Sequence, residues 1–256
     1  MVGVNLFGKT MSQFCINEPY FRVELDHDAT SPNPEVAIWR GQHTCVSELF
    51  AFDEPVPSNP GEIVVKHQMK PKHFSVLRKA YISFCCTGFP HSVIAQITRH
   101  QDSSFLVQSN RFTGRRFVEL GLKKTPAQED IEAVFYFRPI GEYRDRTGSR
   151  FIYTEIERKQ DLNLAWLSCT DYADKINRGC PYEMARGSIP YDFRQSFDIS
   201  GDLQAVFHWL DQRSLADSQL EIQILAEMVM QRLEKWCPTI AKWYRENRWG
   251  KNLLAP

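Results

Sequence analysis

The residues best suited to bind an anion lie between positions 99 and 111. This segment reads Arg-His-Gln-Asp-Ser-Ser-Phe-Leu-Val-Gln-Ser-Asn-Arg, so Arg99 opens it and Arg111 closes it. A guanidinium group presents planar, paired donors that match phosphate oxygens and carbonyls, and the hydroxyl of Ser109 can complete an anion site. Because the formal net charge of the chain is zero, any such site must be a local one.

Two later segments carry further arginines in a defined context. Residues 182–195 contain Glu-Met-Ala-Arg, which ends at Arg186, followed by an Ile-Pro pair. Residues 206–222 contain an apolar stretch that leads to Arg213, then a spacer and Gln-Leu-Glu-Ile. Together with Arg-His-x, seven residues and Ser in the first segment, these patterns resemble the motifs of flavin-dependent thymidylate synthases. The order of the three motifs along the chain also agrees with that family.

The resemblance implies the reductive methylation of a pyrimidine nucleotide. In this reaction dUMP receives a one-carbon unit from methylenetetrahydrofolate and becomes dTMP, while FAD carries hydride from NADPH. The resemblance also implies a homotetramer whose active sites are built from several subunits. The family uses no cysteine nucleophile on the pyrimidine, so none of the seven cysteines needs to be catalytic.

The resemblance also assigns roles to individual residues. Arg213 would be catalytic, because a guanidinium held against the uracil ring stabilises the negative charge that develops on it. The residues expected to bind dUMP are Gln96, Arg99, Val107, Gln108, Ser109, Asn110, Arg111, Arg186 and Arg213. The residues expected to bind FAD are Arg99, His100, Gln101, Asp202, Gln204 and His208.

Several positions on the flavin side depart from the family pattern. The third residue of the signature is Gln101 instead of arginine, and Asp202 and Gln204 stand where an Asn-x-Arg pair is common. The family usually has a Glu in a Phe-Glu-His-like context near the flavin, where this chain has basic residues, and Arg78 or Lys79 could restore positive charge from another direction. These departures leave two alternatives open. One is a related enzyme that accepts dCMP or transfers hydroxymethyl with a reduced role for flavin, and the other is a nucleotide-binding paralogue without activity.

Each candidate residue also has an ordinary structural explanation. Glu183 precedes Arg186 by three residues, a spacing at which the two would pair on a helix. Arg213 could end a helix, His100 and His208 could be packed histidines, and Ser109 could cap a helix. The joint pattern, and no single residue, favours the functional interpretation.

Composition excludes several classes of protein. Lysine and arginine together number 31, as do aspartate and glutamate, so nothing global favours nucleic acid or an anionic membrane as a partner. No run of about 18 apolar residues is present, and the N-terminal residues do not resemble a secretory signal. The cysteines are odd in number and scattered, which predicts reduced thiols and no metal site. We therefore expect a cytoplasmic protein.

The elements that must position these residues indicate an α+β fold. Apolar periodicity predicts helices at 36–50, 91–99, 160–177, 222–236 and 239–247. Strands are expected in the second half of 74–84, at 115–120 and at 133–138, with loop or helix at 105–109. Turn signals predict a hairpin insertion at 138–155.

No shift in composition suggests two domains. We expect one domain over residues 1–256, with an antiparallel sheet packed against long helices. The resemblance covers about Ile63 to Arg248, and residues 1–60 match it poorly.

Overall fold

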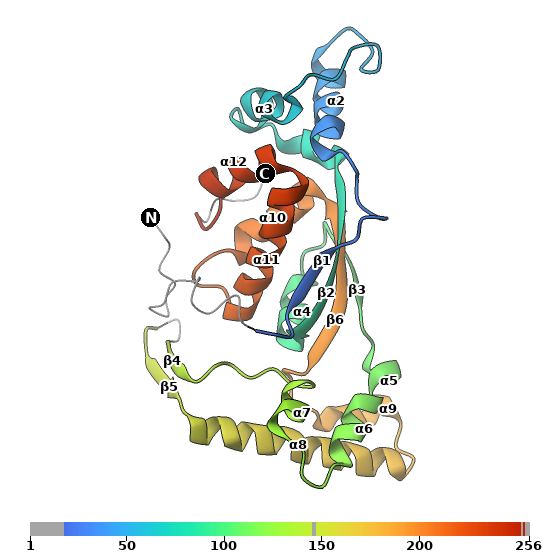
Figure 1. Cartoon of the computed structure of the whole chain (residues 1–256), viewed down its shortest axis with the longest axis vertical. Helices are drawn as coiled ribbons and strands as arrows, with labels where there is room; N and C mark the ends of the chain where they lie inside the picture. The colour runs from blue at the N-terminus through green and yellow to red at the C-terminus, as the bar shows by residue number, and fades with distance from the viewer. Residues whose placement is uncertain (1–17, 145–146, 252, 254–256) are drawn as a thin grey trace. The chain divides into compact units, whose positions relative to one another are not determined.

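The computed structural model describes residues 18–144, 147–251 and 253. It has the expected α+β architecture, with helices and a four-stranded sheet of order β1-β2-β6-β3 (Figure 1). The strands of this sheet are β1 (Arg22–Leu25), β2 (Tyr81–Pro90), β3 (Ser104–Val107) and β6 (Arg194–Asp202). No helix in the described part of the chain is long and apolar enough to cross a membrane.

Internal contacts divide the chain into two compact units. Unit 1 comprises Thr87–Gln96, Leu106–Phe197 and the described residues up to Phe21. Unit 2 comprises Arg22–Cys86, Ile97–Phe105 and the described residues from Asp198 onward. The expectation of a single domain over residues 1–256 stays a prediction.

Unit 2 is built around two apolar helices, α10 (Leu203–Arg213) and α11 (Leu220–Trp236). The apolar positions of α11 recur at three and four residues, and α11 packs on β1 (Figure 1). Pro238 begins the next helix, since proline fits the first turn of a helix but cannot continue one. The other helical elements of this unit are α2 (Pro34–Val46), α3 (Pro60–Val64), η1 (Val65–Met69), η2 (Phe74–Lys79) and α12 (Pro238–Asn247).

A buried polar network fixes α10 to the C-terminal part of unit 2. The carboxylate of Asp211 accepts hydrogen bonds from the Tyr244 hydroxyl at 2.8 Å and from Arg248 Nη2 at 2.6 Å. Burial raises the pKa of Asp211, and the bonds from Arg248 and Tyr244 oppose that rise. The ring of Tyr244 also stacks on Phe207 at 4.0 Å between centroids. These contacts hold the helix that carries Arg213 in one orientation.

Unit 1 has its own apolar core around the long helix α8 (Glu155–Asn177). Helix α6 (Arg115–Gly121) packs along α8, and Phe117, Leu120 and Tyr172 are buried in the core that the two helices share (Figure 1). Gly121 allows this approach, because a Cβ there would lie 2.1 Å from the backbone oxygen of Cys169. The smaller elements are α4 (His91–Ile97), α5 (Asn110–Thr113), α7 (Gln128–Glu132), α9 (Tyr182–Ala185) and η3 (Arg186–Ser188).

A two-stranded hairpin lies where the turn signals predicted one. Strand β4 (Gly141–Arg144) pairs antiparallel with β5 (Arg150–Tyr153), in a register that sets Gly141 opposite Tyr153. That this hairpin is an insertion relative to the family stays a prediction.

Three expectations about local structure were wrong in whole or in part. Residues 115–120 form helix α6 and not a strand, because Phe117 and Leu120, three residues apart, face the same core. Ala133 and Val134 form a turn after α7, and within 133–138 only Phe135 makes an isolated bridge, to Phe193. The expectation of loop or helix at 105–109 failed for 105–107, which belong to strand β3, whereas 108–109 are loop. Strand β6 was not predicted at all.

Candidate functional site

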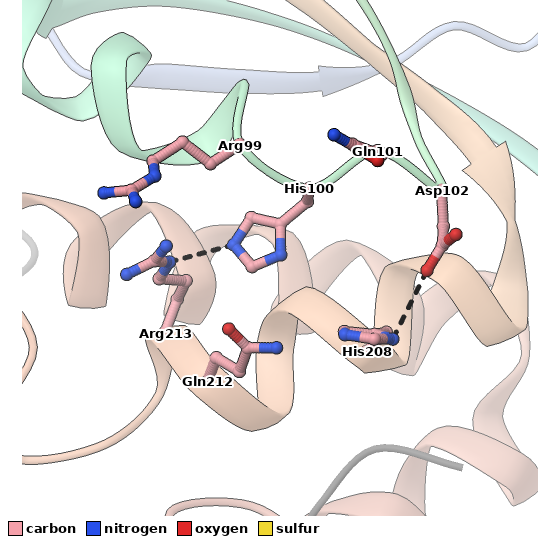
Figure 2. Close-up of a pocket in the computed structure, with 7 residues that line it drawn as sticks. All are labelled: Arg99, His100, Gln101, Asp102, His208, Gln212 and Arg213. Carbon is pink, nitrogen blue, oxygen red and sulfur yellow. Dashed lines mark hydrogen bonds and ion pairs between the residues drawn. The ribbon is translucent and has the colours of Figure 1, made fainter.

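The C-terminal part of α10 and the segment after α4 form one polar cavity within unit 2. Its volume is about 530 Å³. Figure 2 shows the guanidinium groups of Arg99 and Arg213 on the same side of the cavity, with the ring of His100 beside them. The lining residues are Arg99, His100, Gln101, Asp102, His208, Gln212 and Arg213.

Local folding explains why these side chains converge. His208 and Gln212 are four residues apart and therefore share one face of α10. Trp209 and Leu210, on the other side of the helix, are both fully buried. The backbone of the other segment turns tightly, because the His100 amide donates to the Ile97 carbonyl and the Ser103 amide donates to the His100 carbonyl. The segment thereby faces the polar side of α10.

The central contact of the cavity joins His100 and Arg213. Arg213 Nε donates a hydrogen bond to His100 Nε2 at 2.9 Å. Since arginine can only donate, Nε2 must be the unprotonated nitrogen of a neutral imidazole. Burial, and secondly the positive charge of Arg213, lower the pKa of His100 to about 4. The cavity therefore holds a neutral histidine that orients a permanently charged guanidinium.

Positive charge in this cavity is concentrated and partly desolvated. Burial, and secondly the nearby charge of Arg99, lower the pKa of Arg213. Within the described residues no carboxylate lies within ion-pair distance of Arg99. Two guanidinium groups lie near each other here, and that of Arg99 has no carboxylate partner within the described residues. This arrangement favours the binding of an anionic ligand.

A second, smaller cavity adjoins the first. Its volume is about 280 Å³, and it shares Asp102 and His208 with the larger cavity. Asp102 Oδ2 lies 3.4 Å from His208 Nδ1. The remaining lining residues are Arg78, Asp202, Gln204 and Ala205. All six residues expected to bind FAD thus line one or both of these cavities.

The structure also shows what the side chains of Asp202 and Gln204 do locally. Asp202 caps α10, because its Oδ1 accepts a hydrogen bond from the Ala205 amide at 2.9 Å. Gln204 Oε1 accepts a hydrogen bond from Arg78 Nε at 2.7 Å. Aspartate at position 202 therefore has a structural explanation, whatever its role toward a ligand.

Several residues expected to bind dUMP belong to unit 1 and do not line these cavities. Gln96 bonds to the Ser92 carbonyl on its own helix at 3.2 Å. Gln108 is tied to β6, because its Oε1 accepts from the Ser196 amide at 3.3 Å. Val107 is exposed on β3.

The remaining dUMP candidates cluster around α5 and α9. Ser109 caps α5 by accepting from the Arg111 amide at 3.4 Å, as the structural explanation predicted. Arg111 Nε lies 3.9 Å from the carboxylate of Glu183, so Glu183 pairs with Arg111 instead of with Arg186. Asn110 Oδ1 accepts from Arg116 Nη2 at 3.3 Å. Within the described residues the exposed Arg186 has no ion-pair partner.

Sequence reasoning missed two lining residues, Asp102 and Gln212. Asp102 lies inside the signature segment, and Gln212 follows His208 at helical spacing. Both signals were present in the sequence, but neither residue has a counterpart in the motifs on which the resemblance was based.

Comparison with known proteins identifies the family. The family model described as thymidylate synthase complementing protein matches residues 27–239. The flavin-dependent thymidylate synthase of Haloarcula marismortui is 28% identical over 205 residues, which cover 76% of this chain and 80% of that protein. The corresponding enzyme of Halobacterium salinarum is 24% identical and covers 88% of this chain and 92% of its own length.

Solved structures show the same fold. A UMP/dUMP methylase, PolB, from Streptomyces cacaoi bound with 5-Br dUMP has a TM-score of 0.73 at 17% identity and covers 92% of this chain and 97% of its own. Thymidylate synthase X from Helicobacter pylori with FAD and dUMP has a TM-score of 0.67 at 16% identity. The match covers 87% of this chain and 97% of that chain. The chain belongs to the thymidylate synthase complementing protein family, as its motifs indicated.

Proposed function

We propose that this protein is a flavin-dependent thymidylate synthase of the cytoplasm, which methylates dUMP to dTMP with methylenetetrahydrofolate as carbon donor and NADPH as reductant. The observation that carries the proposal is the convergence of Arg99, His100 and Arg213 in one cavity. The names of the similar relatives support the same reaction. The solved thymidylate synthase with FAD and dUMP supports FAD as the cofactor.

The residues of the two cavities fit a flavin nucleotide. FAD carries a diphosphate and a hydrogen-bonding ring system, so it needs cationic donors and neutral polar groups. Arg99 supplies a guanidinium that no described carboxylate neutralises, and Gln101, Gln204 and His208 supply polar groups that can form hydrogen bonds. When bound, FAD would supply the hydride-carrying chemistry, and the protein would bind and orient the reactants.

Arg213 is the residue that we assign to the chemistry on the pyrimidine. Its Nε is held by His100, so the guanidinium has a fixed orientation before any ligand binds. A preorganised cation beside the uracil carbonyl stabilises a negatively charged ring, and partial burial makes that stabilisation stronger than in water. His100 orients Arg213 without adding a charge of its own at neutral pH.

We assign the unit 1 residues to the nucleotide phosphate and ring. Arg186 and Arg111 are exposed, and the resemblance places both on dUMP together with Gln96, Val107, Gln108, Ser109 and Asn110. The resemblance also supports a homotetramer in which several copies contribute to each site. Sedimentation of the purified protein tests this assembly, because a monomer at all concentrations would contradict it.

The decisive experiment is anaerobic spectroscopy followed by product analysis. The purified protein is mixed with FAD and dUMP, and NADPH is then added. A flavin spectrum that bleaches, followed by dTMP on addition of methylenetetrahydrofolate, is the expected result. Absence of flavin binding and of dTMP would contradict the proposal.

A second candidate, a related pyrimidine nucleotide hydroxymethylase, rests on Asp202 and Gln204. These residues stand where the family pattern has an Asn-x-Arg pair, so one cation is missing from the flavin side. The enzyme would then act on dUMP or dCMP with a reduced role for FAD. The same assay separates the two candidates, since a hydroxymethylated product formed without NADPH oxidation would favour the second. Nucleotide binding without any product would favour the paralogue without activity.

A further inference from the structure

The smaller cavity contains an arginine that no motif assigns to a ligand. Arg78 lies in η2, and its Nε donates to Gln204 Oε1 at 2.7 Å. The segment that carries Arg78 and the helix that carries Gln204 both belong to unit 2, and η2 packs against α10. Because one donor is fixed by Gln204, the orientation of the guanidinium plane is restricted before a ligand arrives.

The charges around this cavity do not satisfy Arg78. Two carboxylates share its lining, but both have other partners. Asp202 Oδ1 accepts from the Ala205 amide at 2.9 Å, and Asp102 faces His208 at 3.4 Å. In the part of the chain that the structure describes, no carboxylate lies within ion-pair distance of Arg78. Its two Nη groups therefore remain available to an anion from solution.

The two neighbouring cavities could hold one elongated ligand. The two cavities meet at Asp102 and His208. Arg78 lines only the smaller cavity, whereas Arg99 and Arg213 line only the larger one. A ligand that occupies both cavities would be elongated and would carry an anionic group near Arg78. A dinucleotide has this form.

We propose that Arg78, oriented by Gln204, binds the diphosphate of the flavin nucleotide. A guanidinium with Nε fixed can direct both Nη groups at phosphate oxygens, which is the geometry of a bidentate contact. Arg78 thereby supplies from η2 the positive charge that Gln204 does not supply from α10. This inference rests on the proposed flavin dependence, and it makes Gln204 a positioning residue.

The test compares Arg78→Gln with a matched control, Arg22→Gln. Arg22 is an exposed arginine of the same unit that lines neither cavity. Titration of each protein with FAD, followed by flavin fluorescence, should show about tenfold weaker binding for Arg78→Gln, which corresponds to about 1.4 kcal/mol. The control should bind FAD like the unaltered protein. Gln204→Ala should give a smaller loss, since Arg78 keeps its positive charge in this variant and loses only its fixed orientation.

Riboflavin and salt distinguish phosphate binding from a structural role. Riboflavin has no phosphate, so Arg78→Gln should bind it like the unaltered protein. The affinity for FAD should also fall less steeply with salt in this variant, because one charge contact is gone. Equal losses for FAD and riboflavin, or unchanged FAD binding, would overturn the inference.

A second variant, Arg78→Lys, keeps the inference testable if Arg78→Gln does not fold, as checked by circular dichroism. Lysine retains the positive charge but has a single ammonium group, so it cannot make the paired contact with phosphate oxygens. Its affinity for FAD should therefore fall by about threefold, with riboflavin binding unchanged. FAD affinity equal to that of the unaltered protein, or an equal loss for riboflavin, would overturn the inference here as well.

Failure of the proposed function would be distinguishable from failure of this inference. If the unaltered protein does not bind FAD, inorganic pyrophosphate is titrated by calorimetry in its place. If the unaltered protein binds pyrophosphate and Arg78→Gln does not, Arg78 is still an anion-binding residue, although the protein does not use flavin. Pyrophosphate binding that is absent, or equal in both proteins, would overturn the assignment of Arg78.

Discussion

Two arginines, Arg194 in unit 1 and Arg99 in unit 2, show opposite uses of the same side chain. Arg194 is 5% exposed, and its three nitrogens donate to the Glu132 carbonyl, the Gly88 carbonyl and the Glu18 carboxylate at 2.7–2.8 Å. Arg99 is exposed, lines a cavity and has no carboxylate partner within the described residues. An arginine whose donors all bond to protein acceptors stabilises the fold, whereas one that faces a cavity without a protein anion is suited to a ligand.

The largest expected effect is on stability, at Arg194. Arg194→Met would leave the carboxylate of Glu18 and two carbonyls without their donor. Breaking a buried ion pair in this way costs about 3–5 kcal/mol. Urea unfolding measures the loss, and Arg99→Met is the matched control with an expected change below about 0.5 kcal/mol. Similar losses of unfolding free energy in both variants would show that Arg194 and Arg99 do not differ in their contribution to stability.

The next effect is on catalysis, at Arg213. Arg213→Lys keeps a positive charge but loses the fork that His100 orients. Loss of a preorganised group that stabilises developing charge lowers kcat by about 10²–10³-fold. Stopped-flow and steady-state measurement of dTMP formation gives this number. The assignment would be wrong if kcat stayed within a factor of about three while only KM changed.

The third effect is the dependence of stability on pH, through His100. Its pKa is about 4 in the folded protein and 6.5 in the unfolded reference. Because the folded pKa is depressed, the unfolded chain takes up the proton at a higher pH than the folded protein does. The contribution of neutral His100 to the free energy of unfolding is therefore complete above pH 6.5 and is lost as the pH falls toward 4. The unfolding free energy should therefore fall by about 2 kcal/mol more in the unaltered protein than in His100→Gln between about pH 7 and pH 4. Parallel pH profiles of the two proteins would show that His100 is not the responsible group.

The smallest effect on stability is expected at Ser109. Its hydroxyl caps the four-residue helix α5 through a bond of 3.4 Å, so Ser109→Ala should cost about 0.5 kcal/mol. Affinity for dUMP should fall more, by about tenfold, if the hydroxyl also contacts the nucleotide. Calorimetric titration of Ser109→Ala with dUMP distinguishes these two roles. Unchanged affinity for dUMP would mean that the Ser109 hydroxyl only caps α5.

The sequence predicted helices better than strands, for a physical reason. Helix α11 was evident because four fully buried residues, Ile222, Leu225, Val229 and Leu233, recur at three and four. Strand β6 was missed because Phe197 and Ile199 are its only large apolar residues, whereas its buried Arg194 and Gln195 are polar. Helix α6 was mistaken for a strand because Phe117 and Val118 favour strands locally, whereas packing on α8 decides the outcome.

The sequence predicted which residues form the candidate site but not which of them contact one another. Motifs singled out Arg99, His100, His208 and Arg213, and the structure places all four on one cavity. The hydrogen bond between His100 and Arg213 joins residues 113 positions apart, so only the tertiary fold could reveal it. The roles of Ser109 and Gln108 in local structure likewise depend on backbone partners that the sequence does not specify.

The bonds from Tyr244 and Arg248 to Asp211 have a consequence for the order of events during protein synthesis. Asp211 precedes Arg213 on α10, but its partners are translated well after both. Until Tyr244 and Arg248 have left the ribosome, the buried carboxylate lacks its donors and α10 lacks its anchor. The wall of the cavity can therefore become rigid only after Tyr244 and Arg248 have been translated, so a nascent chain that ends before them would not capture nucleotide.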